Sequence, residues 1–214
     1  MQHKSNDHII EGIFPIGLYR AHKSSLDPTD EAELEDLIKK RKKDYSRGFK
    51  ITEDKYIFET KLANLKEFCE KHIKIYVKEV LGNLDQGLTF YITQSWLVIT
   101  KPGGDVNVHW HSNSIISGVF YISVKEDDHI CFYDPLKKHR KPYILINRDE
   151  YGVWYSDIFR ANVNNNELIL FPPWLEHGFT SNEKNTTDRI SLSFNVFVKG
   201  SIGIQGTTNE LVLR

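Results

Sequence analysis

The sequence has few cysteines, almost no net charge and no long uninterrupted hydrophobic run. Only two cysteines, Cys69 and Cys131, occur among 214 residues. They could pair, but no export signal accompanies them, so we expect both to be reduced thiols. The 28 Lys and Arg residues nearly balance the 29 Asp and Glu residues. No global electric field therefore draws the protein to nucleic acid or to an anionic membrane.

The remaining composition is that of a globular domain. The longest apolar stretch, near Ile115, is interrupted by Ser117 and Gly118, so no transmembrane helix is predicted. The first residues are polar and no apolar signal core follows them, so a cytoplasmic location is expected. With 40% hydrophobic and 27% charged residues, disorder is excluded, and the length suits one domain spanning residues 1–214. The sequence contains no internal repeat.

The N-terminal part of the chain, residues 1–87, is predicted to be mainly helical. Asp27 and Pro28 form a typical helix start, with an N-cap residue followed by proline. Acidic residues come next, and the basic run 39–43 is expected to close this helix in the order that a helix dipole favours. A second helix is predicted over residues 61–81, because apolar residues recur at three- and four-residue steps.

From residue 88 onward, β-branched and aromatic residues dominate. Strands are predicted at residues 89–100, 115–124, 130–133, 167–171 and 189–198. Helices followed by several strands indicate an α+β chain, whose β part, residues 88–200, is a sandwich or a barrel. Residues 201–214 form a C-terminal tail. Residues 134–166 are long for a loop and hold either short elements or a lid.

The first candidate functional pair is His109 and His111. If both lie in a strand, their side chains project from the same face and could reach one metal ion. Imidazole is a common ligand of iron, zinc and copper. Two partly exposed polar residues on a strand edge would give the same pattern.

A third histidine, His177, follows a predicted strand and a double proline. Pro172 and Pro173 cannot donate hydrogen bonds to a strand ladder, so the strand ends there. The stiff turn then presents His177, either as a ligand or as an ordinary surface histidine.

Residues 189–196 alternate strictly between polar and apolar. The polar members are Arg189, Ser191, Ser193 and Asn195. A half-buried strand with a solvated face gives this pattern. So does a strand that lines a polar cavity inside a barrel, where an arginine can hold a carboxylate through two parallel hydrogen bonds.

Together these motifs resemble the Fe(II)- and 2-oxoglutarate-dependent oxygenase superfamily, in which an early His-x-Asp/Glu pair, a late histidine and then a basic residue occur in this order. Within it, segments 109–121, 132–135, 170–177 and 189–195 are similar to a branch of 2OG-Fe(II) oxygenases found in bacteria and marine phages. The similarity covers residues 88–200 well, and the N-terminal helices only loosely. It implies a double-stranded β-helix, or jelly roll, with N-terminal helices.

The resemblance also implies roles for single residues. His109, His111 and His177 would bind Fe(II). Arg189, helped by Ser191, would hold the far carboxylate of the cosubstrate 2-oxoglutarate. Tyr121 and Asn195 would belong to the cosubstrate pocket, to which Ser117 is also assigned. The implied activity couples oxidative decarboxylation of 2-oxoglutarate to oxidation, such as hydroxylation, of a small molecule or a protein side chain, with ascorbate as a stimulant.

One position departs from the superfamily pattern. Residue 111 is histidine where most members have a carboxylate. Either three histidines bind the iron, or His111 lies beside it and another group or water completes the site. Two alternatives stay open. One is a cupin-like three-histidine metalloenzyme that does not use 2-oxoglutarate, against which Arg189 and Ser191 argue. The other is a non-enzymatic jelly-roll binding module. The oxidised substrate and the oligomeric state are not predicted.

Overall fold

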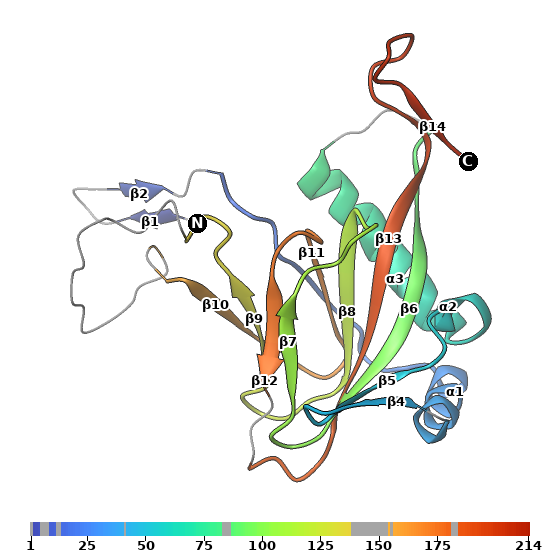
Figure 1. The fold of residues 1–214 in the computed structure, drawn as a ribbon, viewed down its shortest axis with the longest axis vertical. Helices are drawn as coiled ribbons and strands as arrows, with labels where there is room; N and C mark the ends of the chain where they lie inside the picture. Colours follow the sequence, from blue (N-terminus) through green and yellow to red (C-terminus); the bar gives the residue numbers. More distant parts are fainter. Residues whose placement is uncertain are drawn as a thin grey trace.

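Two antiparallel β-sheets face one another, and helices cover the outer face of the larger sheet (Figure 1). The computed structural model describes residues 2–4, 9–11, 14–40, 42–82, 87–137, 154, 156–180 and 184–214. Two short strands near the N-terminus, β1 (Gln2–Lys4) and β2 (Ile9–Glu11), pair only with each other. Within these ranges, no helix combines the length and the apolar character that a membrane span needs.

The larger sheet contains every long strand that was predicted except the one at residues 130–133. Its order is β3 (Tyr19–His22), β11 (Glu167–Phe171), β8 (Ile116–Ser123), β13 (Arg189–Ile202), β6 (Thr89–Thr100), β5 (Phe49–Thr52) and β4 (Lys42–Tyr45). The strand β14 (Leu211–Leu213) pairs with the far end of β13, so part of the expected tail extends this sheet.

The smaller sheet is built from shorter strands. Its order is β10 (Ile158–Asn162), β9 (His129–Tyr133), β12 (His177–Thr180) and β7 (Asp105–His109). Of these, only β9 was predicted as a strand from a run of apolar residues. β10 lies in the irregular segment 134–166, of which residues 138–153 and 155 are outside the described part of the chain.

The two predicted helices are present with small changes. α1 (Pro28–Lys39) begins as expected, and the Asp27 side chain accepts a hydrogen bond from the backbone of Thr29. It ends at Lys39, so the later basic residues do not close it: Lys42 and Lys43 belong to β4. The second helix consists of α3 (Ala63–Tyr76) and a π-helical turn, η1 (Val77–Leu81), and a short helix, α2 (Ile57–Thr60), precedes it.

The N-terminal part is more mixed than its sequence predicts. Besides the helices it contributes β3, β4 and β5, which join the larger sheet at both of its edges. β3 pairs with β11, and β5 pairs with β6. These strands are only four residues long, and β4 is rich in charge. Short charged strands at a sheet edge lack the apolar alternation on which sequence prediction depends.

Two apolar clusters stabilise the fold. One lies between the helices and the larger sheet, and the other lies between the two sheets. Leu192, Phe194 and Val196 of β13 belong to the first cluster and are fully buried. Phe194 packs against the backbone of Gly118, where an added Cβ would come within 2.1 Å of the ring. The alternation of β13 therefore places its polar residues on the opposite face, toward the space between the sheets.

A bulge changes which residues of β6 face that space. Asn195 of β13 lies opposite Gln94, but the next residue, Val196, lies opposite Ile92, so Thr93 is the extra residue. Because successive strand residues alternate between faces, one extra residue exchanges the faces. Ile92 packs with the helix-side cluster, whereas from Gln94 onward the even-numbered residues face the space between the sheets.

Candidate metal centre

Three histidines converge at one end of the space between the sheets. His109 is the last residue of β7, His177 is the first residue of β12, and the two lie opposite each other in the strand pairing. His111 follows β7, and its backbone N–H donates to the carbonyl of Pro173 at 2.9 Å. The ring centroids are 4.4 to 5.3 Å apart, and one potential ligand atom of each histidine lies within 4.8 Å of the other two.

The backbone that places the three histidines is not a regular strand in which side chains simply alternate. The sequence predicted His109 and His111 in one strand. β7 ends at His109, however, so His111 lies beyond it. In addition, His177 pairs with His109 but Phe179 pairs with Val106, so β7 contains one extra residue. Val106 and His109 consequently both face the cavity. A bulge and a tethered loop, rather than regular alternation, bring the rings together.

The double-proline turn behaves as predicted. β11 ends at Phe171, and Pro172 accepts a hydrogen bond from the backbone of Leu175, which closes the turn. Leu175 is buried in the cluster between the sheets. His177 itself is only 4% exposed, so it is not a surface loop residue.

Hydrogen bonds define which nitrogen of each ring is free. The Nδ1 atoms of His109, His111 and His177 lie 2.7, 2.6 and 2.9 Å from the carbonyl oxygen of Asn107, the side-chain oxygen of Asn195 and the carbonyl oxygen of Leu175, respectively. These oxygens can only accept, so each Nδ1 carries the hydrogen. Each Nε2 then keeps a lone pair, which is the form of histidine that binds metals.

Burial keeps two of these rings neutral. Desolvation lowers the pKa of His177 to about 3, and the neighbouring His109 contributes in the same direction. Burial also lowers the pKa of His111, although its hydrogen bond to Asn195 opposes this shift. Both rings are therefore uncharged at neutral pH. Neutral imidazoles suit Fe(II) and related transition metals, so the donor set fits such an ion.

The other end of the cavity holds a buried arginine. The cavity has a volume of about 90 Å³ and is lined by residues of both sheets, including Tyr121, Arg189 and Ser191. The Arg189 guanidinium carbon lies 3.6 Å from the centre of the Phe179 ring and 5.0 Å from that of Tyr121. Arg189 is 6% exposed, so the alternative of a solvated polar strand face does not apply.

This arginine is incompletely paired. Within the described part of the chain, its Nε atom and the hydroxyl of Tyr121 lack a hydrogen-bond partner and Arg189 forms no ion pair, although Asp128 attracts its charge. Burial lowers the pKa of Arg189 and raises that of Tyr121 to about 12, against the attraction of the adjacent guanidinium. Buried polar atoms without partners are unusual in folded proteins. An anionic ligand in the cavity would complete them.

Two residues expected in the cosubstrate pocket are not among those that line the cavity directly. Asn195 does not line the cavity but contacts His111, and Ser117 is a buried neighbour of Asn195 whose hydroxyl has no partner. The sequence analysis missed Trp96, whose ring centroid lies 5.7 Å from that of His111, and Phe179, which packs on Arg189. Both are strand residues with no local signal of their own.

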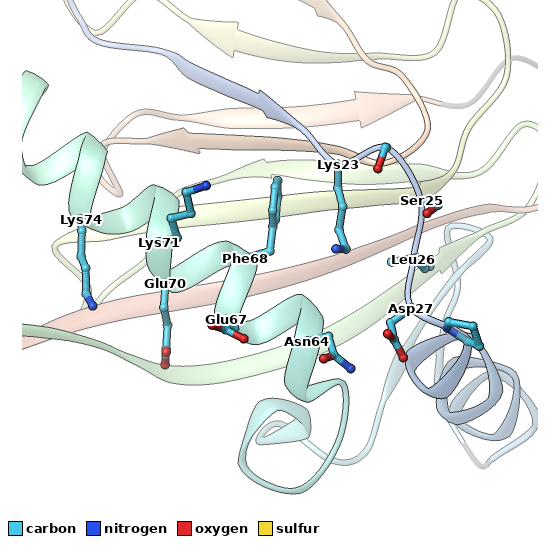
Figure 2. Close-up of a pocket in the computed structure, with 12 residues that line it drawn as sticks. Lys23, Ser25, Leu26, Asp27, Asn64, Glu67, Phe68, Glu70, Lys71 and Lys74 are labelled. Atoms are coloured by element: carbon cyan, nitrogen blue, oxygen red, sulfur yellow. The ribbon is translucent and has the colours of Figure 1, made fainter.

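A larger hollow, of about 670 Å³, lies on the other face of the larger sheet, between α3 and residues 23–28. Figure 2 shows its lining, in which Glu67, Glu70, Lys71 and Lys74 follow one another along α3. These side chains do not converge on a point as the histidines do. The chemistry is therefore sought in the smaller cavity.

Comparison with known proteins agrees with this choice. Residues 94–195 match a family model described as "Putative 2OG-Fe(II) oxygenase". The matched segment covers just under half of the chain and is similar to this family. It includes the three histidines and Arg189. The assignment to a branch from bacteria and marine phages stays a prediction. Comparison with curated protein sequences gives no match.

Solved structures show the fold of the chain. HygX from Streptomyces hygroscopicus, with nickel and 2-oxoglutarate bound, superposes with a TM-score of 0.55 and 11% identity, covering 91% of this chain and 85% of that one. A Trichoplax adhaerens prolyl hydroxylase in complex with a hypoxia inducible factor peptide fragment gives 0.55 and 12%, covering 85% and 83%. A viral collagen prolyl hydroxylase from Paramecium Bursaria Chlorella virus-1 gives 0.52 and 10%, covering 84% and 94%. The expected jelly roll is confirmed.

Proposed function

We propose that this chain is a 2OG-Fe(II) oxygenase that binds one ferrous ion through His109, His111 and His177 and holds 2-oxoglutarate through Arg189. The observation that carries the proposal is the pairing of three convergent neutral imidazoles with a buried, incompletely paired guanidinium in one cavity. When bound, the iron and dioxygen supply the oxidation, and decarboxylation of 2-oxoglutarate to succinate and carbon dioxide drives it. The organic substrate is a small molecule or a protein side chain.

The protein contributes orientation to the metal. Each hydrogen bond from Nδ1–H holds its ring so that the lone pair of Nε2 is free to bind the metal. Because His111 and His177 are already uncharged, the metal displaces no proton from them at neutral pH. The burial of His177 therefore has a function: it destabilises the charged form of the ring and keeps it neutral for metal binding.

The protein also contributes a binding site for an anion. A carboxylate beside Arg189 would accept from the unpartnered Nε, and charge-assisted hydrogen bonds of this kind are strong. Tyr121 stays protonated, since its pKa is about 12, and can donate its hydroxyl hydrogen to the same ligand. Ser191 lines the cavity next to these groups and supplies a further hydroxyl.

The charge of the cavity favours the use of 2-oxoglutarate over the cupin-like alternative. None of the residues that line it is Asp or Glu. A divalent metal and Arg189 would bring three positive charges into a space with no negative side chain. A dianionic cosubstrate balances most of that charge, whereas an enzyme with three histidines and no anionic ligand would leave only the attraction of the buried Asp128 to Arg189. A binding module needs neither group.

Proteins with this fold have been solved with more than one class of organic molecule bound. HygX has been solved with hygromycin B bound, and the Trichoplax adhaerens enzyme has been solved with a peptide. The same fold thus accepts a small molecule or a polypeptide. Hydroxylation is the proposed outcome in either case. A cytoplasmic location is also proposed, and it is supported by the two free thiols, Cys69 and Cys131.

Succinate formation tests this function without knowledge of the organic substrate. Purified protein given Fe(II), ascorbate and 2-oxoglutarate should release succinate slowly, as measured by mass spectrometry. His177→Ala should abolish release, whereas His129→Ala should retain it, because His129 bonds only to a local carbonyl and lies outside the cavity. Equal release from wild type and His177→Ala, or none from metal-loaded wild type, would contradict the proposal.

A further inference from the structure

We infer that Asn195 and Gln94 are positioning residues of the metal centre, which fix the ring of His111 and make position 111 suited to histidine rather than to a carboxylate. The inference rests on the proposed function and adds two residues to it. It explains, from the interior of the protein, why this chain departs from the usual ligand type of its superfamily.

The three histidines are held in different ways. His109 and His177 each bond through Nδ1 to a backbone carbonyl two residues earlier, so the local chain alone orients them. His111 instead bonds to the side chain of Asn195, which is 84 residues away in sequence. It lies in a loop outside any strand. Its ring orientation therefore depends on a contact with the opposite sheet.

The hydrogen bonds run in one direction through this contact. The Nδ1–H of His111 donates to Oδ1 of Asn195 at 2.6 Å, and Nδ2 of Asn195 donates to Oε1 of Gln94 at 3.0 Å. Asn195 is 5% exposed, so water does not readily replace these partners. The amino end of the Asn195 amide thus points toward Gln94, and its Oδ1 points toward position 111.

That polarity suits an imidazole and not a carboxylate. A carboxylate at position 111 has no hydrogen to donate and would face Oδ1 of Asn195, another acceptor. Turning the Asn195 amide would relieve this contact but would set its Oδ1 against Oε1 of Gln94. Two amides would have to turn together. The network therefore favours a ligand with an N–H on its inner side, which histidine provides.

The strand bulge is part of the same device. In a regular strand Ile92 and Gln94 would lie on the same face of the sheet, and the bulge at Thr93 places them on opposite faces. The Thr93 hydroxyl donates to the carbonyl of Asn195 at 3.2 Å, which fastens the bulge next to the amide pair. The backbone irregularity and the His111 contact thus occur at one place.

Binding of Co(II) tests the inference, with calorimetry for affinity and visible absorption for the donor set. Asn195→Leu should weaken Co(II) binding about tenfold or more, because loss of such outer hydrogen bonds has that effect. It should also change the Co(II) spectrum. Asn195→Asp keeps an acceptor for the Nδ1–H, and Gln94 can turn to donate to it, so this variant should retain affinity and spectrum. Gln94→Leu should fall between them.

Asn64→Leu is the matched control, since Asn64 is an exposed asparagine in the hollow beside α3 and should not affect Co(II) binding. If Asn195→Leu binds Co(II) with the affinity and spectrum of wild type, the inference is wrong and the proposed function stands. If wild type does not bind Co(II), the proposed function itself fails. Should Asn195→Leu not fold, Gln94→Leu decides: unchanged affinity and spectrum would overturn the inference.

Discussion

The two faces of β13 are both buried but are packed on different principles. On the helix side, Leu192, Phe194 and Val196 belong to the apolar cluster between the helices and the larger sheet. On the cavity side, Arg189 and Asn195 are as buried, yet Arg189 keeps an unpartnered Nε and Asn195 is fully engaged with two side chains. The helix-side face therefore stabilises the fold. The cavity-side face lowers stability by burying polar groups, and a bound anion and metal would offset this loss.

Breaking the apolar face should produce the largest loss of stability. Phe194→Ala removes a fully buried ring that packs on Gly118 and Phe58, and such changes cost about 3–5 kcal/mol. Urea denaturation measures this loss directly. Metal affinity of the fraction that remains folded should be unchanged, because the ring points away from the cavity. A loss below about 1 kcal/mol would show that the helix-side cluster is not the main core.

Breaking the polar face should have the opposite effect on stability. Arg189→Met replaces a buried, incompletely paired charge with an apolar chain of similar size, which is expected to stabilise the metal-free protein because the desolvated charge is costly. The same change should weaken 2-oxoglutarate binding at least about tenfold, through loss of charge-assisted hydrogen bonds. Thermal unfolding and calorimetry measure the two effects.

Lys199→Met is a suitable control for Arg189→Met, because Lys199 lies on the same strand but is exposed. It should change neither quantity. If Arg189→Met instead lowers stability and leaves 2-oxoglutarate binding unchanged, the guanidinium is structural.

The two faces should also differ in their response to acid. The pKa of His177 is about 3 in the folded protein and near its ordinary value of 6.5 when unfolded, so the unfolded state takes up more protons between these values. Stability of the metal-free protein should therefore be full above about pH 6.5 and fall as the pH drops, by up to about 1.4 kcal/mol per pH unit for this group. His111 acts in the same direction.

Urea denaturation at several pH values between 7 and 4 measures this slope. His177→Gln should flatten it, whereas Phe194→Ala should lower the whole curve without changing its shape. A slope that is as steep in His177→Gln as in the wild type would mean that groups other than His177 cause the acid sensitivity.

Regular features were predictable from sequence because their causes are local. The strict alternation of residues 189–196 predicted both faces of β13, since a strand repeats every two residues. The double proline before His177 predicted the end of β11 and the turn that follows. Long apolar strands were found for the same reason.

Irregular features were not predictable, because their causes lie in distant parts of the chain. The bulge in β7 that turns His109 inward appears only in its pairing with β12. The contact between His111 and Asn195 requires both the loop after β7 and the bulge in β6. The helix start at Asp27 was found, but the helix end was misplaced, because the basic run 39–43 suits a helix end and also an exposed edge strand.

Whether three imidazoles bind one ion can be measured directly by X-ray absorption on the anaerobic Fe(II)-loaded protein. The account predicts a spectrum fitted by three histidine ligands, with one fewer in each of His109→Ala, His111→Ala and His177→Ala. A spectrum with two histidines in wild type, left unchanged by His111→Ala, would contradict it and would place another group on the metal.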